Sequence, residues 1–386
     1  MIVSEVGFWT CFGLIIYIYV GYPVIVFLLG PILNHAVKKA NITPPVTVVI
    51  AAFNEEMDIQ ETVVNKLSQE YPVDQLDVIV VSDGSTDRTD EIVRGLIKQS
   101  QGRLRLLRQE PRQGKTQALN LALRHTASEI VVFSDANSIY APSAVRALVR
   151  SFADSGVGYV TGQMVYTNPA GTGIPEGSST YMHYENALRK RETRLGSIVG
   201  VDGGVDAIRR KLYVPMRPDQ LPDFTLPLSV VEQGKRVVYE PDAVLFEPAL
   251  VNEKDEYRMR VRVSLRAFWA MFDKRRLFNP ARHTLFSWQL ISHKVLRYAA
   301  FIPIAGMFLF NVFAVNRHGT YIFFLALQLA LYAAAGVGHV FRQSSGVPRR
   351  FLAPYYFVLI NLACMVAFWK FVQRQKMVLW TPRGGA

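Results

Sequence analysis

The stretch VVSDGSTDRTD, residues 80–90, joins the end of an apolar segment to a cluster of Asp, Gly, Ser and Thr residues. The β-branched valines are typical of the end of a buried strand, and the polar residues are typical of a turn that opens a helix. Turn and capping chemistry can by itself explain such a junction. Whether Asp83 and Asp87 have a second role therefore depends on the rest of the chain.

The same order of strand, polar turn and helix recurs along residues 46–140. We expect strands in VTVVIAAFNEE, LDVIVVSDGS, LRLLRQ and EIVVFSDANS, and helices in MDIQETVVNKLSQ, TDRTDEIVRGLIKQS and GKTQALNLALRHT. Apolar strands that alternate with helices predict a parallel sheet covered by helices. Ligands bind such sheets beyond the carboxyl ends of the strands. The polar residues at these ends are therefore expected to share one crevice: Asn54, Glu55, Asp83, Asp135 and Asn137.

Four polar residues have both a structural and a chemical interpretation. Asp135 and Asn137 in FSDANS are either turn residues or oxygen ligands for Mg²⁺ or Mn²⁺ bridging a diphosphate. Lys115 follows Gly114 at an expected helix start, where a cation is unusual unless an anion such as phosphate binds there; the alternative is a surface lysine. Asp223 is either a helix N-cap or a general base.

Long apolar segments flank this polar middle. Residues 8–33 carry no charge and are long enough to span a bilayer. Similar runs near residues 296–315, 320–340 and 351–372 predict three more spans, although each run alone also fits a buried core helix. The basic residues between His35 and Lys39 favour a cytoplasmic polar domain. Four spans would then place the basic C-terminal residues outside, against the same rule.

The formal net charge of +12 is concentrated partly in RMRVRVSLRAFWAMFDKRR, residues 258–276. Apolar residues interrupt the basic ones, which fits a helix at an anionic membrane surface better than a nucleic-acid groove. A solvated basic face is the alternative. The two cysteines lie in apolar segments and indicate no disulfide framework or cysteine metal site. The Gly- and Pro-rich residues 168–180 favour a connector over a lid.

In combination, these motifs resemble the family 2 glycosyltransferases with the GT-A fold, in the membrane-embedded branch that includes cellulose and hyaluronan synthases. The resemblance covers roughly residues 46–297. It rests on the ordered motifs AAFNEE, VVSDGSTDRT, RQGKTQALN, FSDANS, VDGGVDAIRR, DFTLPLSVVEQGKRVVYEP and YRMRVR. It implies an α/β GT-A (Rossmann-like) nucleotide-sugar domain inserted between transmembrane helices, with an amphipathic interfacial helix.

The resemblance also implies roles for individual residues. Asp223 stands at the position of the catalytic base, and Asp135 and Asn137 stand at the position of the metal-binding D-x-D motif. The positions that contact the UDP-sugar in the family correspond here to Phe53, Glu55, Asp83, Lys115, Arg258 and Arg260. Asp83 would read the uracil edge, whereas Asp87 is expected to start the helix. The implied reaction inverts the anomeric carbon and requires Mg²⁺ or Mn²⁺.

This sequence departs from the family pattern at three places. Asn137 replaces the second metal-binding acid, and Pro222 replaces the acid before Asp223. Tyr257 and Val261 replace the Gln and Trp of a Gln-x-x-Arg-Trp motif that is associated with a growing glycan. Trp269 is a candidate stacking platform for the acceptor. These departures leave three interpretations: polysaccharide or lipid-linked glycan synthesis, single-sugar transfer to a polyisoprenoid lipid, and an inactive membrane scaffold.

The expected organisation has four parts. Residues 1–40 form an N-terminal transmembrane helix, 41–250 the glycosyltransferase domain, 251–294 an amphipathic interfacial segment, and 295–386 a membrane region of about three helices. The expected partners are a UDP-sugar, a glycan or lipid-linked acceptor and membrane lipids, with no nucleic acid. The expected location is the cell membrane, with the polar domain cytoplasmic.

Overall fold

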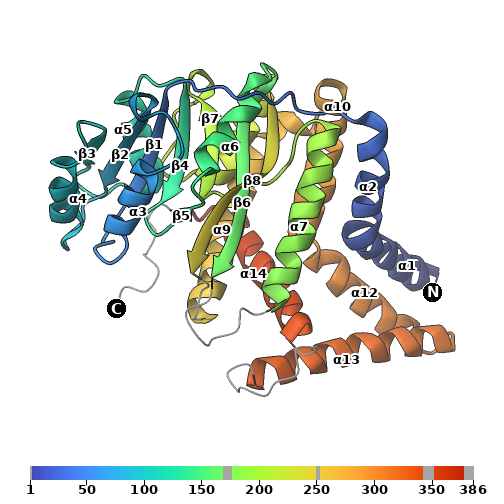
Figure 1. The fold of residues 1–386 in the computed structure, drawn as a ribbon. Helices are drawn as coiled ribbons and strands as arrows, with labels where there is room; N and C mark the ends of the chain where they lie inside the picture. Colours follow the sequence, from blue (N-terminus) through green and yellow to red (C-terminus); the bar gives the residue numbers. More distant parts are fainter. Residues whose placement is uncertain (1, 168–175, 249–252, 342–351, 378–386) are drawn as a thin grey trace.

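A mixed β-sheet with helices on both faces occupies one end of the molecule, and long apolar helices occupy the other (Figure 1). The computed structural model describes residues 2–167, 176–248, 253–341 and 352–377. The strands are β1 (Val46–Ala52), β2 (Leu76–Ser82), β3 (Leu104–Arg108), β4 (Ile130–Asp135), β5 (Ile139–Tyr140), β6 (Val157–Thr167), β7 (Val205–Arg209) and β8 (Arg236–Pro248). The helices are α1 (Ile2–Ile16), α2 (Tyr22–Leu33), α3 (Ile59–Leu67), α4 (Thr89–Ile97), α5 (Lys115–Arg124), α6 (Ala144–Arg150), α7 (Glu176–Leu195), α8 (Pro222–Glu232), α9 (Glu253–Asp273), α10 (Pro280–Leu290), α11 (Leu296–Tyr298), α12 (Phe301–Ala314), α13 (Gly319–Phe341) and α14 (Leu352–Val372).

The first half of the sheet confirms the predicted parallel arrangement. The strand order is β3-β2-β1-β4-β7-β6-β8-β5, and β3, β2, β1 and β4 all pair in parallel. All seven residues of β1 are buried, as expected for a strand covered on both faces. The carboxyl ends of β1, β2 and β4 therefore lie at one edge, where their polar side chains meet.

The second half of the sheet differs from the parallel prediction. β7 pairs antiparallel with both β4 and β6, β8 pairs parallel with β6, and β5 pairs antiparallel with β8. Antiparallel strands need no crossover helix. Residues 157–248 nevertheless alternate strand and helix, in the order β6, α7, β7, α8 and β8, so this alternation alone does not predict the strand directions.

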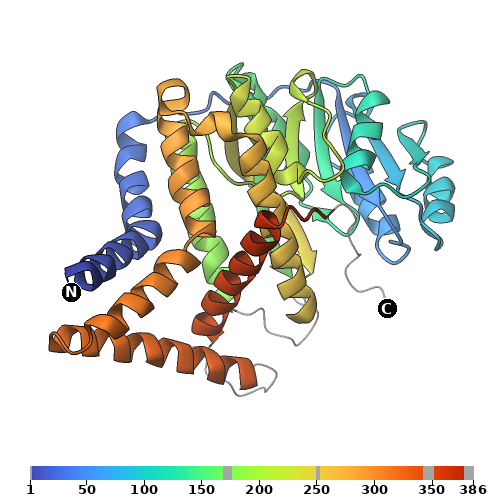
Figure 2. The same cartoon turned by 180° about the vertical axis from the view of Figure 1, so that it is seen from behind.

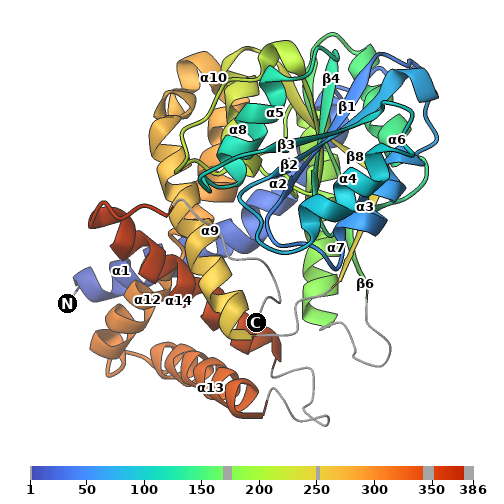
Figure 3. The ribbon, with the colours of Figure 1, turned by 90° about the vertical axis from the view of Figure 1, so that its left-hand side faces the viewer.

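Alternate residues of the central strands point into two cores, on opposite faces of the sheet. Val48 and Ile50 of β1 pack in a core with α3, α4 and α6, whereas Val49 and Ala51 pack in a core with α5, α8 and α9. Figure 3 shows the two sets of helices on either side of the strands. The result is a three-layer α/β/α domain, here called the sheet domain.

Three helical segments of the described residues are long and apolar enough to cross a membrane: Ile2–Leu33, Gly319–Phe341 and Leu352–Val372. The first contains a π-helical turn at Tyr17–Gly21 between α1 and α2. Where a span was expected near residues 296–315, the chain instead forms a bent pair, Pro280–Tyr298 and Phe301–Ala314, with an angle of 59°. Counting the bent pair as one span gives four.

The C-terminal end of α14 returns to the sheet domain (Figure 2). Val261, Leu265 and Phe268 of α9 pack in the same core as Ala363 and Ala367 of α14. Beyond α14, the ammonium of Lys376 lies 2.6 Å from the carboxylate of Asp219, which precedes α8. α9 thus lies between the sheet domain and α14.

The expected connector at residues 168–180 falls partly outside the described residues, which omit 168–175. Its last five residues are not a connector. They belong to α7, which begins at Glu176.

Candidate active site

Lys115 and Asp135 form an ion pair at the edge of the sheet. Asp135 is the last residue of β4, and Lys115 is the first residue of α5. The Lys115 Nζ donates a hydrogen bond to Asp135 Oδ1 at 2.5 Å. Burial opposes the charge of Lys115, but the carboxylates of Asp135 and Asp223 outweigh it and raise the pKa of Lys115 above its ordinary value. The structure therefore places Asp135, one of the residues predicted to share a crevice, beside Lys115 and near Asp223, the two other candidates.

Asp83 holds the loop that leads to Lys115. It is fully buried at the end of β2. Its carboxylate accepts hydrogen bonds from Gln109 Nε2 at 2.6 Å, from the backbone N–H of Gln113 at 2.8 Å and from that of Gly114 at 2.9 Å. Both carboxylate oxygens are thus bonded to residues 109–114. The predicted contact of Asp83 with uracil remains a prediction.

Phe53, predicted to contact the nucleoside, lies under a guanidinium. The Cζ of Arg112 is 3.4 Å from the centroid of the Phe53 ring. Because Arg112 also lies 3.5 Å from Asp83 through its Nε atom, the loop that carries it forms a cover over the ring. A base that stacked on this face of Phe53 would have to displace Arg112.

Asp87 lies two residues before α4 and bonds to the first residue of that helix, in keeping with its expected role at the helix start. Its carboxylate accepts hydrogen bonds from the backbone N–H and the hydroxyl of Thr89, the first residue of α4, at 3.0 and 2.6 Å. It also accepts one from the backbone N–H of Glu56 at 3.0 Å. Glu55, a predicted nucleotide-binding residue, donates its backbone N–H to the Thr89 hydroxyl at 2.9 Å. These bonds join the turns after β1 and β2.

Asp223 is the second residue of α8, not its N-cap. The helix begins at Pro222, and the capping position, Leu221, makes no side-chain cap. Burial and the nearby Asp135 carboxylate raise the pKa of Asp223, against the opposing charges of Lys115 and Arg266. A carboxylate in this environment is suited to accept a proton from a hydroxyl.

Gly203 packs directly against this carboxylate. Gly203 has φ +88°, and a Cβ added to it would lie 2.5 Å from Cγ of Asp223. The loop VDGG before β7 therefore forms one wall of the site.

Arg266 was not predicted as a site residue, but from α9 it contacts Thr116 and lies near Asp223. It is 8% exposed, and its Nη2 donates to Thr116 Oγ1 at 3.2 Å and also to the carbonyl oxygen of Gln220. Burial lowers the pKa of Arg266 to about 10, although the nearby Asp223 partly opposes this effect. The signal in the sequence is the spacing of Arg258, Arg262 and Arg266, since residues four apart share one face of a helix.

The two predicted arginines lie further along α9. Arg258 is exposed and Arg260 is partly buried. Their assignment to the diphosphate remains a prediction.

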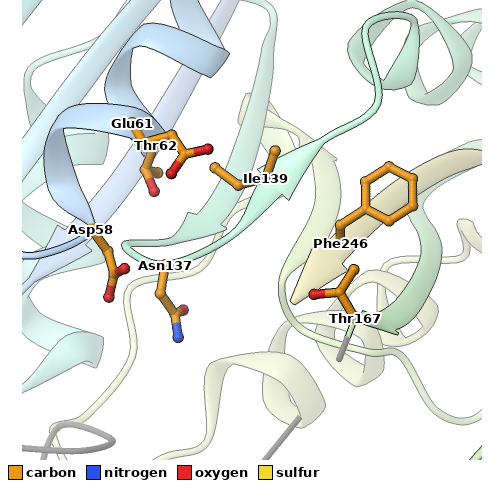
Figure 4. A pocket seen from close by; sticks show the side chains of 7 residues that line it. All are labelled: Asp58, Glu61, Thr62, Asn137, Ile139, Thr167 and Phe246. Carbon is orange, nitrogen blue, oxygen red and sulfur yellow. The ribbon is translucent and has the colours of Figure 1, made fainter. Parts of the chain in front are cut away.

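Asn137 lines a pocket of about 370 Å³ next to the end of β4. Figure 4 shows Asn137 and Asp58 on one side of this pocket, and Thr167 and Phe246 on the other. Among the described residues, no group of three or more His, Cys, Asp or Glu side chains is arranged to hold a metal ion. Asp135 and Asn137 together offer one carboxylate and one amide oxygen.

Trp269 packs against the C-terminal end of α14. Its Nε1 donates to the carbonyl oxygen of Gln375 at 2.8 Å, and its ring packs edge-on against Phe371 at 4.8 Å. The idea that Trp269 stacks on an acceptor sugar is not supported. This ring instead joins α9 to α14.

Part of the chain matches a known family and several known proteins. The family model for glycosyl transferase family 2 matches residues 47–214. A β-monoglucosyldiacylglycerol synthase from Nostoc is 31% identical over 170 residues, which are 44% of this chain and 36% of that protein. A poly-β-1,6-N-acetyl-D-glucosamine synthase from Staphylococcus aureus is 25% identical over 204 residues, 52% of this chain and 48% of that one. The chain thus spans about a third to a half of the length of these relatives.

One solved structure matches nearly the whole chain. The mannosyltransferase PcManGT from Pyrobaculum calidifontis, in complex with GDP-Man and Mn²⁺, superposes with a TM-score of 0.73 at 23% identity. The match covers 95% of this chain and 98% of that one, so the two share a fold that includes the apolar helices. Residues 47–214 thus match the model of glycosyl transferase family 2, and the fold of the chain is that of PcManGT.

Proposed function

We propose that the protein transfers one sugar from a nucleoside diphosphate sugar to an acceptor hydroxyl or phosphate at a membrane surface. The observation that carries this proposal is the position of Asp223. Its carboxylate is close enough to the Lys115–Asp135 pair, and to Arg266 of α9, for their charges to shift its pKa, and α9 packs on the apolar helix α14. The chemical site and the membrane helices are thus adjacent.

The proposed reaction is a single in-line displacement. The acceptor oxygen forms a bond to the anomeric carbon while the bond from that carbon to the diphosphate oxygen breaks and its electron pair leaves with the diphosphate. Asp223 takes the proton of an acceptor hydroxyl. Lys115 and Arg266 stabilise the negative charge of the leaving diphosphate. One displacement at the anomeric carbon inverts its configuration.

Asp135 and Asn137 would hold a divalent cation, which neutralises charge on the diphosphate. One carboxylate and one amide form a weak set for a dedicated protein site but fit an ion held largely by the donor's phosphates. In support, Asp135 is partly exposed, with a side chain 32% accessible. PcManGT was solved with Mn²⁺ and GDP-Man.

Two observations point to different nucleotide bases in the sugar donor. Family resemblance suggests UDP, whereas PcManGT binds GDP-Man. Residues 109–114 cover the Phe53 ring and occupy Asp83, so the nucleoside pocket must form by movement of this loop. Donor preference then depends on the loop as well as on Asp83.

The contacts made by two residues of α9 favour transfer of a single sugar over chain elongation. Val261, at the position of the tryptophan in Gln-x-x-Arg-Trp, is buried in the core with α14. The ring of Trp269 packs against Phe371, and its Nε1 donates a hydrogen bond to Gln375. No aromatic platform from these two positions is available to hold a growing glycan.

We also propose that residues 34–45 and 373–377 lie on the same side of the membrane as the sheet domain. The pair between Lys376 and Asp219 supports this, as does the pair between Lys39 and Glu240 at 2.7 Å. The chain must then cross the membrane an even number of times between the end of α2 and the end of α14. With that number, the basic residues after α2 and those after α14 lie on one side, as the positive-inside rule requires. The basic flanks predict that this side is the cytoplasm.

The test is donor turnover by purified protein in lipid nanodiscs. A panel of UDP- and GDP-hexoses is supplied with Mg²⁺ or Mn²⁺, with diacylglycerol and a polyprenyl phosphate as acceptors. Release of the nucleoside diphosphate and mass spectrometry of the lipid product are measured together. A lipid bearing one sugar supports the proposal, and long glycans support elongation. Absence of turnover with every donor and acceptor supports the inactive scaffold.

A further inference from the structure

One face of α7 carries three buried charged side chains. Glu185, Arg189 and Glu192 are 4%, 7% and 0% exposed, and residues at this spacing share one face of a helix. Buried ion pairs add little net stability because removing charges from water opposes their attraction. Three such charges on one face indicate that they fix an arrangement of neighbouring elements.

Glu192 joins α7 to the membrane helix α2. One carboxylate oxygen accepts hydrogen bonds from the hydroxyl of Tyr22 and from His293 Nδ1, the latter at 2.7 Å. The other accepts from the backbone N–H of Val199 at 3.4 Å. Glu192 therefore contacts α2, the bent helix and the loop that follows α7.

Arg189 joins α7 to the wall of the active site. Its Nη2 lies 2.6 Å from Asp202 Oδ1, and both side chains are less than a tenth exposed. The backbone N–H of Asp202 donates to Thr161 Oγ1 at 3.4 Å. Asp202 directly precedes Gly203, which lies against Asp223. The Arg189–Asp202 pair thus sets the position of the glycine that touches the proposed base.

Glu185 joins the same face of α7 to the bent helix pair that contains His293 and Arg297. It accepts a hydrogen bond from Arg297 Nη1 at 2.5 Å and lies 3.4 Å from His293 Nε2. His293 belongs to a π-helical turn, Ile291–Val295, which faces the π-helical turn in the first segment through the hydroxyls of Tyr17 and Ser292, 2.7 Å apart. π-Helical turns are frequent at functional positions.

We propose that the charged face of α7 connects the membrane helices to the catalytic base and holds that base in position. Arg189 and Asp202 are positioning residues that hold Gly203 against Asp223. Glu192 and Tyr22 anchor this arrangement to α2. The inference rests on the proposed function, since it assigns these residues to the placement of the proposed base.

The test compares three variants with the wild-type protein in nanodiscs. Arg189→Met removes the ion pair, Arg189→Lys retains a cation, and Tyr22→Phe removes only the hydroxyl that reaches Glu192. Tyr321→Phe is the matched control, since the Tyr321 hydroxyl accepts from Trp9 Nε1 at 3.3 Å, away from α7. Steady-state turnover, donor KM and hydrogen–deuterium exchange of residues 196–206 are measured for each protein.

We expect Arg189→Met to lower kcat about tenfold or more at an unchanged donor KM, because small misplacements of reacting groups have large effects on rate. Lysine at position 189 should restore part of kcat. Tyr22→Phe should lower kcat less than Arg189→Met does, and both should speed exchange of residues 196–206. Tyr321→Phe should resemble the wild type in all three measurements.

Two results would overturn the inference. One is slow, wild-type exchange of residues 196–206 in both Arg189→Met and Tyr22→Phe. The other is an equal loss of kcat in Tyr22→Phe and Tyr321→Phe. If the wild-type protein itself shows no turnover, the proposed function fails, and the exchange measurement still decides whether α7 positions the loop.

Discussion

Gly203 lies so close to Asp223 that no side chain fits between them. An added Cβ would be 2.5 Å from Cγ of Asp223, and the φ of +88° at Gly203 disfavours other residues as well. Gly203→Ala should therefore displace Asp223 and lower kcat by about 100-fold. Donor affinity should stay near the wild-type value, because the Lys115–Asp135 pair is not touched. Turnover and equilibrium donor binding in nanodiscs measure the two effects separately.

Gly234→Ala is the matched control for backbone strain. Gly234 has φ +72°, but nothing lies within 4 Å of an added Cβ. This variant should lose about 1 kcal/mol of stability from strain yet keep its turnover. Equal turnover in Gly203→Ala and Gly234→Ala would refute the packing argument at Asp223.

Lys115→Met should have opposite effects on the two proposed ligands. Because the variant loses the Lys115 ammonium and its hydrogen bonds, it should bind the nucleoside diphosphate sugar about tenfold or more weakly. Mn²⁺ binding without donor should become tighter, because the Lys115 ammonium no longer occupies Asp135 Oδ1 at 2.5 Å. Electron paramagnetic resonance of free Mn²⁺ and calorimetry with the donor measure these effects. Lys211→Met, at an exposed lysine, is the control; weaker Mn²⁺ binding in Lys115→Met alone would contradict the competition.

Asp206, fully buried beneath the site, should make stability depend on pH. Burial and the nearby Asp223 raise the pKa of Asp206 to about 7, although the Tyr159 hydroxyl donates a hydrogen bond to it at 2.9 Å. A carboxyl whose pKa is raised on folding stabilises the protein below its unfolded-state pKa, and this contribution is lost as pH rises through the folded-state pKa. Asp206→Asn does not titrate.

Relative to the wild type, the melting temperature of Asp206→Asn should therefore increase from about pH 5 to about pH 8. Differential scanning fluorimetry across this range measures the difference. The exposed Asp74→Asn is the control and should show no such trend. A constant difference between Asp206→Asn and the wild type would mean that Asp206 does not titrate in this range.

The parts of the site that follow from local pattern were predicted from the sequence. Asp83 and Asp135 end apolar strands of a parallel sheet, and Lys115 begins a helix after glycine, so their convergence follows from the sheet topology. Strands β6 and β7 are also separated by a helix, yet they pair antiparallel. Their pairing depends on contacts between distant residues.

The partners of the predicted residues were not predictable in the same way. Asp83 binds backbone N–H groups of residues 113 and 114, which carry no signal in residue type. The Arg189–Asp202 pair joins a helix to a loop, and nothing in the sequence marks the two residues as neighbours. Arg266 was marked only by its spacing from Arg262 and Arg258, and its contact with Thr116 depends on how α9 packs on α5.

The most direct test of the central claim compares Asp223→Asn with the wild type for donor binding and for turnover. The variant keeps the size of the side chain but removes its ability to take a proton at neutral pH. We predict donor affinity within about twofold of the wild type and turnover lower by about 100-fold or more, in the range of losses from removing a general base. Turnover by Asp223→Asn that remains near the wild-type rate would contradict the assignment of Asp223 as the catalytic base.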